Sequence, residues 1–118
     1  MMATIKLFAT MLVVGLAGCA DPHSWPHQTF ETAQWFTKSE AERYVLVKDL
    51  IERKLLIGKS RDEVVAILGT PSYESNSGNY ADYVVKSGGN GYTRVWFLRV
   101  KFNLSNGMVD ETIIGGED

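Results

Sequence analysis

A run of alternating apolar and polar residues at positions 94–104 restricts the fold more than any other feature of the sequence. Successive side chains of a β-strand point to opposite faces, so apolar residues at every second position share one face. The pattern predicts a long strand with one face buried and with Arg99 and Lys101 on the other face. The residues of the buried face are Trp96, Leu98, Val100, Phe102 and Leu104.

Two further strands are predicted beside this one, because turn sequences separate it from two shorter runs. Residues 80–85 are joined to it by a glycine-rich stretch, and residues 108–114 follow the Asn106 and Gly107 turn. An Asn-Gly pair favours the positive φ of a tight hairpin. We therefore expect a three-stranded antiparallel meander, followed by a frayed tail at residues 115–118.

Two helices are predicted before the strands, each introduced by a capping box in which a serine and a glutamate satisfy free N–H groups. Apolar residues at helical spacing give each helix one buried stripe. The sequence thus predicts an α+β domain over residues 39–114, with two N-terminal helices packed on a three-stranded antiparallel β-meander. The boxes and helices are Ser39 with Glu42 before residues 40–56, and Ser60 with Glu63 before residues 61–68.

The amino terminus has the pattern of a bacterial lipoprotein signal, with a positive Lys6 before an apolar stretch. A helix over that stretch would rise only about 18 Å, against roughly 30 Å for a hydrocarbon core, which disfavours a membrane span. We expect residues 1–18 to be removed and a lipid on the cysteine to anchor the chain. The lipobox is Leu16, Ala17, Gly18 and the lipid-attachment residue Cys19.

Residues 19–38 are predicted to be a tether between the lipid and the domain, because two prolines and many polar residues interrupt any regular period. A flexible chain of this length would span roughly 24 Å. Four aromatic residues are unusual in a solvated linker. We expect Trp35 and Phe36 to pack on the domain, and Trp25 and Phe30 are candidates for docking on a partner or on the lipid interface.

Length, charge and cysteine content indicate one domain and argue against nucleic-acid binding and against a disulfide. Removing the signal leaves 100 of the 118 residues, which is enough for one small domain. The net charge of −2 lacks the basic surplus of a nucleic-acid-binding protein. Cys19 is the single cysteine, so no internal disulfide can form and the fold must rely on packing.

Residues that could support catalysis or bind a metal are not grouped in the sequence. His23 and His27 would suit a metal only on a helix, which the neighbouring prolines disfavour, and no cysteine or carboxylate cluster joins them. Because both histidines lie in the predicted tether, no serine is expected to have a histidine beside it as an activating base. Asp62 and Glu63 point apart on a helix and suit its positive end. We expect no enzyme activity, no metal and no cofactor.

The run from Gly58 to Pro71 (Gly-Lys-Ser-Arg-Asp-Glu-Val-Val-Ala-Ile-Leu-Gly-Thr-Pro) resembles the signature of the SmpA/OmlA (BamE-like) family of small outer-membrane lipoproteins. The order of elements over residues 39–114 agrees as well, and Lys59 departs from the methionine that is frequent in the family. The resemblance implies two helices on a three-stranded sheet, a fold similar to that of the β-lactamase inhibitor protein. The matched positions are Gly58, Arg61, Val64, Leu68, Gly69 and Pro71.

The resemblance also implies a place and a role. The place is the periplasmic face of the outer membrane, favoured over the inner membrane because Ala20 and not aspartate follows the cysteine. The role is that of an accessory lipoprotein that supports outer-membrane β-barrel assembly by binding protein, with the barrel-assembly machinery as its partner. The alternative is an inhibitor or sensor module that binds an envelope enzyme.

A candidate partner surface lies on the strand face that carries the odd-numbered residues. If the even-numbered side of the long strand faces the helices, Val95 and Phe97 lie beside Arg99 on the opposite side. Apolar and basic residues together would suit a protein partner or anionic lipid headgroups. Alternatively, the aromatic residues of the predicted tether fold back and cover this face.

Overall fold

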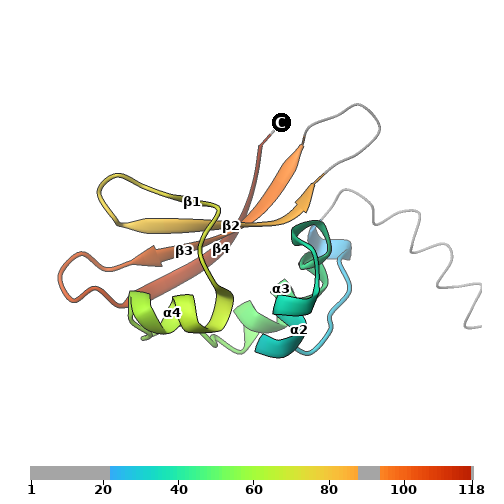
Figure 1. Cartoon of the computed structure of the whole chain (residues 1–118), viewed down its shortest axis with the longest axis horizontal. Coiled ribbons are helices and arrows are strands. Elements are labelled where there is room, and N and C mark those ends of the chain that lie inside the picture. Colours follow the sequence, from blue (N-terminus) through green and yellow to red (C-terminus); the bar gives the residue numbers. More distant parts are fainter. Residues whose placement is uncertain (1–21, 88–93, 118) are drawn as a thin grey trace, which may run out of the picture.

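Four antiparallel strands form the sheet in the computed structural model, which describes residues 22–87 and 94–117 (Figure 1). Sequence neighbours pair with one another across the sheet, so the predicted meander is confirmed. The predicted number of three strands is corrected to four, because a two-residue strand is too short to show an alternating pattern. The strands are β1 (Tyr73–Glu74), β2 (Tyr80–Ser87), β3 (Val95–Phe102) and β4 (Val109–Glu117).

β4 is longer than the sequence predicts. Gly115 pairs with Phe97 and Gly116 pairs with Trp96, so the strand continues through most of the tail predicted at residues 115–118. Two glycines followed by acidic residues do not predict a strand from sequence. Here main-chain pairing with β3 makes residues 115–117 a strand.

All the described helices lie on one face of the sheet (Figure 1). They are α2 (Thr32–Thr37), α3 (Tyr44–Glu52) and α4 (Arg61–Leu68), with short 3-10 helices η1 (Pro22–Ser24) and η2 (Glu40–Glu42). The predicted bounds of α4 are confirmed, and so is its capping box. Glu63 N donates to Ser60 Oγ over 3.2 Å, and Ser60 N donates to Glu63 Oε1 over 2.8 Å.

The helix predicted over residues 40–56 begins later and ends earlier than expected. Residues 40–42 form η2, and the Ser39 side chain makes no cap hydrogen bond, so that predicted capping box is wrong. After α3 the chain continues in turns, with Lys54 at a positive φ of 54°. These turns bring Leu56 into full burial. The free energy gained by burying the Leu56 side chain exceeds the cost of the positive φ at Lys54, so the chain leaves the helix although its apolar residues continue at helical spacing.

The core lies between the helices and the sheet, and it contains the predicted face of β3. Leu98, Val100 and Phe102 are buried and Trp96 is partly buried. Leu104, predicted on the same face, is 71% exposed because β3 ends at Phe102. The remaining strand and helix residues of the core are Leu46, Val47, Leu50, Val64, Leu68, Ala81, Tyr83, Val85 and Val109, and Leu56 joins them from the turns after α3.

Residues 22–38 pack on the domain, which corrects the tether predicted over residues 19–38. Trp25, Phe30 and Trp35 are all buried in the core. The expected packing of Trp35 is confirmed, whereas Phe36 is 50% exposed. The suggestion that Trp25 and Phe30 dock on a partner is wrong for this structure, because both rings are covered by the domain itself.

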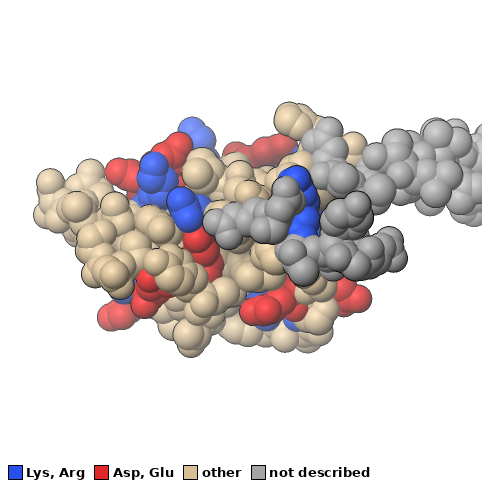
Figure 2. Space-filling model, turned by 90° about the horizontal axis from the view of Figure 1, so that it is seen from above, with Lys and Arg blue, Asp and Glu red and all other residues tan. Residues whose placement is uncertain are grey.

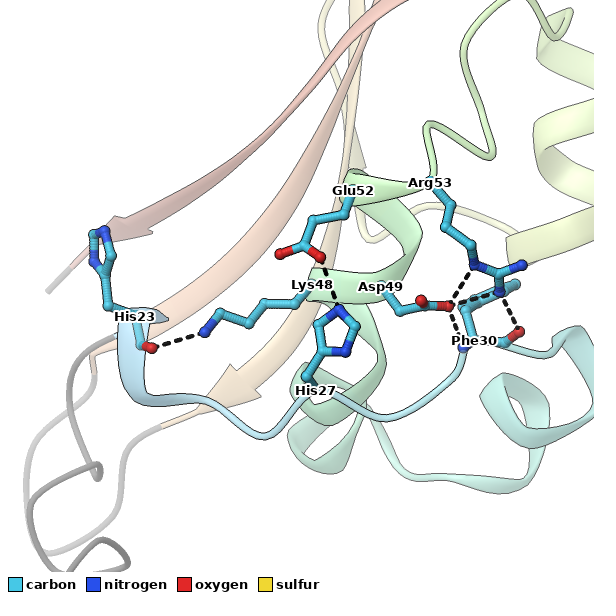
Figure 3. A network of polar contacts seen from close by, with 7 residues as sticks. All are labelled: His23, His27, Phe30, Lys48, Asp49, Glu52 and Arg53. Atoms are coloured by element: carbon cyan, nitrogen blue, oxygen red, sulfur yellow. Dashed lines mark hydrogen bonds and ion pairs between the residues drawn. The ribbon is translucent and has the colours of Figure 1, made fainter.

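Polar contacts fasten residues 22–30 to α3 (Figure 3), and we call this segment the N-terminal clasp. Phe30 N donates to Asp49 Oδ2 over 2.7 Å, and Arg53 Nη2 donates to the same oxygen over 2.6 Å. The guanidinium of Arg53 and the N–H of Phe30 hold the pKa of the Asp49 carboxyl below its ordinary value. The other contacts are Lys48 Nζ to His23 O at 2.7 Å, Gln28 N to Val45 O at 3.0 Å, and His27 Nε2 to Glu52 Oε1 at 2.9 Å.

The expected signal sequence at residues 1–18, the anchor Cys19 and the glycine-rich stretch at residues 88–91 lie outside the described residues. Within residues 22–87 and 94–117, no helix has the length and hydropathy needed to cross a membrane.

Candidate interaction surface

The sheet face opposite the helices, which we call the open face, is not covered by any described helix (Figure 1). Cross-strand pairing places Phe97 opposite Val84 and places Arg99 opposite Asp82 and Ile113. Directly opposed residues of antiparallel strands share a face, so the odd-numbered residues of β3 lie on the open face. The clasp aromatics pack among the helices, and the alternative that they cover this face is therefore wrong.

A hollow of about 440 Å³ lies on the open face. It contains the sequence-predicted Val95, Phe97 and Arg99 together with residues of β1 and β2 that the sequence did not single out. Figure 2 looks down on this face and shows acidic and basic side chains next to one another, with uncharged side chains around them. The lining residues are Ser72, Tyr73, Tyr80, Asp82, Val84, Val95, Phe97 and Arg99.

Arg99 and Asp82 form a bidentate ion pair within the hollow. Arg99 Nε lies 2.8 Å from Asp82 Oδ1, and Arg99 Nη2 lies 2.8 Å from Asp82 Oδ2. The guanidinium carbon is 3.8 Å from the centre of the Tyr80 ring and 5.3 Å from that of Phe97. Two hydrogen bonds and a stacked ring fix the guanidinium in one place, which makes it a rigid part of the surface.

The apolar part of the hollow depends on a glycine. A Cβ on Gly115 would stand 2.6 Å from Phe97 Cε1, so the missing side chain lets the Phe97 ring lie over β4. Val84 and Val95 lie beside it as partly buried residues. The alternation in β3 predicted the face of Phe97, but the role of Gly115 depends on the β3 to β4 register, which the sequence pattern did not give.

The residues of the Gly58 to Pro71 run hold the helices to the sheet. Val64 and Leu68 are buried, and Gly58 N donates to Val109 O over 2.8 Å. Gly69 has φ of +86°, and its carbonyl oxygen accepts a hydrogen bond from Tyr83 Oη over 2.8 Å. Its ψ of −167° lies outside the left-handed helical region. These positions therefore have structural roles.

Arg61 in the same run joins α4 to the β1–β2 hairpin. Its Nη1 lies 2.6 Å from Glu74 Oε2, and its Nη2 donates to the Gly78 carbonyl. Its guanidinium carbon lies 4.2 Å from the centre of the Phe102 ring. Pro71, the last residue of the run, is partly buried.

Two of the other polar residues weighed in the sequence also make structural contacts. His27 is paired with Glu52 in the clasp, and Glu63 closes the α4 capping box. The Ser60 N–H lowers the pKa of the Glu63 carboxyl, as expected for a carboxylate at a helix start. Among the described residues, no group of three or more histidine, cysteine, aspartate or glutamate side chains is placed to hold a metal ion.

Comparison with known proteins adds no relative to this picture. A scan against protein-family models gave no match, and searches of curated proteins and of solved structures gave none either. The resemblance to the SmpA/OmlA family therefore rests on the run from Gly58 to Pro71 and on the order of helices and strands.

Proposed function

We propose that the protein is a lipid-anchored, non-catalytic accessory protein of the cell envelope that binds a protein partner through the open face. The observation that carries this proposal is the rigid hollow around Arg99, which lies on a sheet face that no described helix covers. Cys19 supplies the membrane anchor, and Ala20 after it favours the outer membrane.

The residue types of the hollow support protein binding over small-molecule chemistry. Tyrosine, phenylalanine and arginine are enriched in protein interfaces, and tyrosine and arginine also at the few positions that supply most of the binding energy. The Arg99 charge is already neutralised by Asp82, which reduces the cost of covering the pair with a partner. The Ser72 hydroxyl accepts from Val84 N over 3.0 Å and donates to Glu40 over 3.4 Å, a structural arrangement and not that of an activated nucleophile.

The partner proposed is the machinery that assembles outer-membrane β-barrels, because the Gly58 to Pro71 run resembles the SmpA/OmlA signature. The finer description of the fold, as a member of that family with a fold like that of the β-lactamase inhibitor protein, is part of the same proposal. In this chain the N-terminal clasp, α2 and β1 add to the two helices and three strands that the family description implies.

Site-specific crosslinking tests the proposal. A photo-crosslinking residue replaces Ile113 on the open face, and the same residue replaces Val65 on α4 as the control. The two positions are equally exposed, at 37% and 39%, but lie on different sides of the domain.

We expect a crosslinked partner from position 113 and none from position 65, and identification of the adduct decides the class of function. Barrel-assembly components support the proposed function, whereas a single envelope hydrolase supports the inhibitor or sensor alternative. Equal adducts from both positions, or none from either, contradict binding through the open face.

The anchor has its own test. Replacing Cys19→Ala should abolish labelling with palmitate and release the domain from membranes. Unchanged labelling would refute the lipobox interpretation without bearing on the open face.

A further inference from the structure

The end of the domain at which the described chain begins has a second hollow, of about 380 Å³, separate from the open face. Its lining residues come from η1, α3, β3 and β4, and we call this region the Trp96 end. They are Pro22, His23, Lys48, Trp96 and Ile114.

Aromatic rings gather at the Trp96 end. The Trp96 ring is partly buried and meets the Trp25 ring edge to face, with ring centres 5.8 Å apart. Trp25 in turn meets Tyr44 at 5.4 Å. A Cβ on Gly116 would stand 2.8 Å from Trp96 Cε3, so the indole lies close over the β4 backbone. The outer ring of this stack is thus an indole held against the sheet, with one side towards the hollow.

Basic side chains surround these rings, although the chain as a whole has a net charge of −2. Lys48 Nζ is held 2.7 Å from the His23 carbonyl oxygen. Lys86 Nζ lies 4.5 Å from the centre of the Tyr44 ring, and Arg94 lies 5.3 Å from that of Trp96. A tryptophan flanked by lysine and arginine is the combination that proteins place at the headgroup level of a membrane.

The position of the anchor in the sequence places this end near lipid. Pro22 follows Cys19 by three residues, and three Cα to Cα steps of ~3.8 Å span at most about 11 Å. The contacts of the clasp hold residues 22–30 against α3, so these residues add no length to the connection between Cys19 and the folded domain. If Cys19 carries a lipid, the domain cannot move far from the membrane surface.

We propose that the Trp96 end lies directly on the phospholipid surface that holds the anchor, with Trp96 at the headgroup level and the three cations beside anionic headgroups. The inference rests on the proposed lipid anchor and deepens it, because it assigns the domain one orientation on the membrane. The open face contributes none of these residues and is left for a protein partner.

Fluorescence quenching tests this orientation. The lipidated chain, which begins at Cys19, is placed in vesicles of phosphatidylcholine and phosphatidylglycerol, with or without bromine at shallow acyl positions. We expect brominated lipid to quench the tryptophan emission. The variant Trp96→Phe should lose most of the quenching, because Trp25 and Trp35 are buried. Equal emission from both kinds of vesicle, or undiminished quenching in Trp96→Phe, contradicts the docking.

A pair of charge variants separates docking by this end from general attraction. Lys48→Gln combined with Lys86→Gln should reduce the quenching, whereas Lys101→Gln should not, because Lys101 lies on the open face opposite Glu111. An equal loss in Lys101→Gln contradicts the assigned orientation. Mass measurement of the lipid on Cys19 distinguishes the two levels of failure. A chain without lipid contradicts the anchor itself, and a lipidated chain without quenching contradicts only the docking.

Discussion

Trp35 and Leu68 are joined by a hydrogen bond from the indole Nε1 to the carbonyl oxygen over 2.9 Å. The next carbonyl oxygen, that of Gly69, accepts from Tyr83 Oη. The last carbonyls of a helix lack partners within the helix. Here α2 and β2 supply them, so the end of α4 links the N-terminal segment to the sheet.

The first prediction compares two buried tryptophans. Trp25 Nε1 is buried and has no hydrogen-bond partner in the described structure, whereas Trp35 Nε1 has Leu68. Trp35→Phe should therefore lower the free energy of unfolding by about 1–3 kcal/mol more than Trp25→Phe, because only Trp35→Phe leaves a carbonyl unpaired. Urea denaturation of both variants measures the difference, and equal losses would contradict the hydrogen-bond assignment.

The second prediction concerns the clasp and acid. The folded pKa of Asp49 is lowered, so its contribution to stability is present above the unfolded value of 3.8 and disappears as the pH falls through the folded pKa. Asp49→Asn should be less stable than the natural chain at neutral pH, and the difference should shrink in acid. Urea midpoints across pH measure it, with the exposed Asp110→Asn as the control. A difference that does not change with pH would exclude the charge as its source.

The third prediction concerns a buried phenol. Burial, and then the nearby carboxylate of Glu74, raise the pKa of Tyr83 to about 12 from an ordinary 10.0. Its contribution to stability is complete below the unfolded pKa and is lost as the pH rises towards about 12. In a spectrophotometric titration, the absorbance lost in Tyr83→Phe should be that of a phenol ionising near pH 12. Loss of a component near pH 10 would show that the ring is not buried.

The fourth prediction uses two neighbouring glycines on opposite sheet faces. An added Cβ would meet Phe97 at 2.6 Å for Gly115 and Trp96 at 2.8 Å for Gly116. Each substitution to alanine should displace one ring and leave the other. Gly115→Ala should therefore reduce crosslinking from position 113, and Gly116→Ala should alter the Trp96 emission. Identical effects of both variants on both measurements would show that the two surfaces are not independent.

β2, β3, the first part of β4 and α4 were predictable because their signals are local. Alternation identifies β3, and Ser60 with Glu63 marks the start of α4 through contacts three residues apart. Residues 22–38 have no such signal. α2 has only six residues, and the clasp is held by Asp49 of α3 and by Arg53 just after that helix, so its structure depends on contacts distant in sequence.

The candidate surface was predictable only in part, for a related reason. Alternation placed Phe97 and Arg99 on one face, but the pairing of Arg99 with Asp82 depends on strand register. The β2 to β3 register shifts between Val84 and Lys86, and such an irregularity has no signature in the alternation. The ion pair at the centre of the hollow was therefore visible only in the structure.

The contact between Trp25 and Trp96 has a consequence for the order of folding. The two rings are separated by most of the described chain, and a ribosome releases Trp25 long before Trp96 exists. Contacts of such long range are slow to form, because a large loop must close before they can stabilise it. The Trp25 ring can therefore meet Trp96 only after β3 has been made, whereas the hydrogen bonds of the clasp to Val45, Lys48 and Asp49 need no part of the sheet.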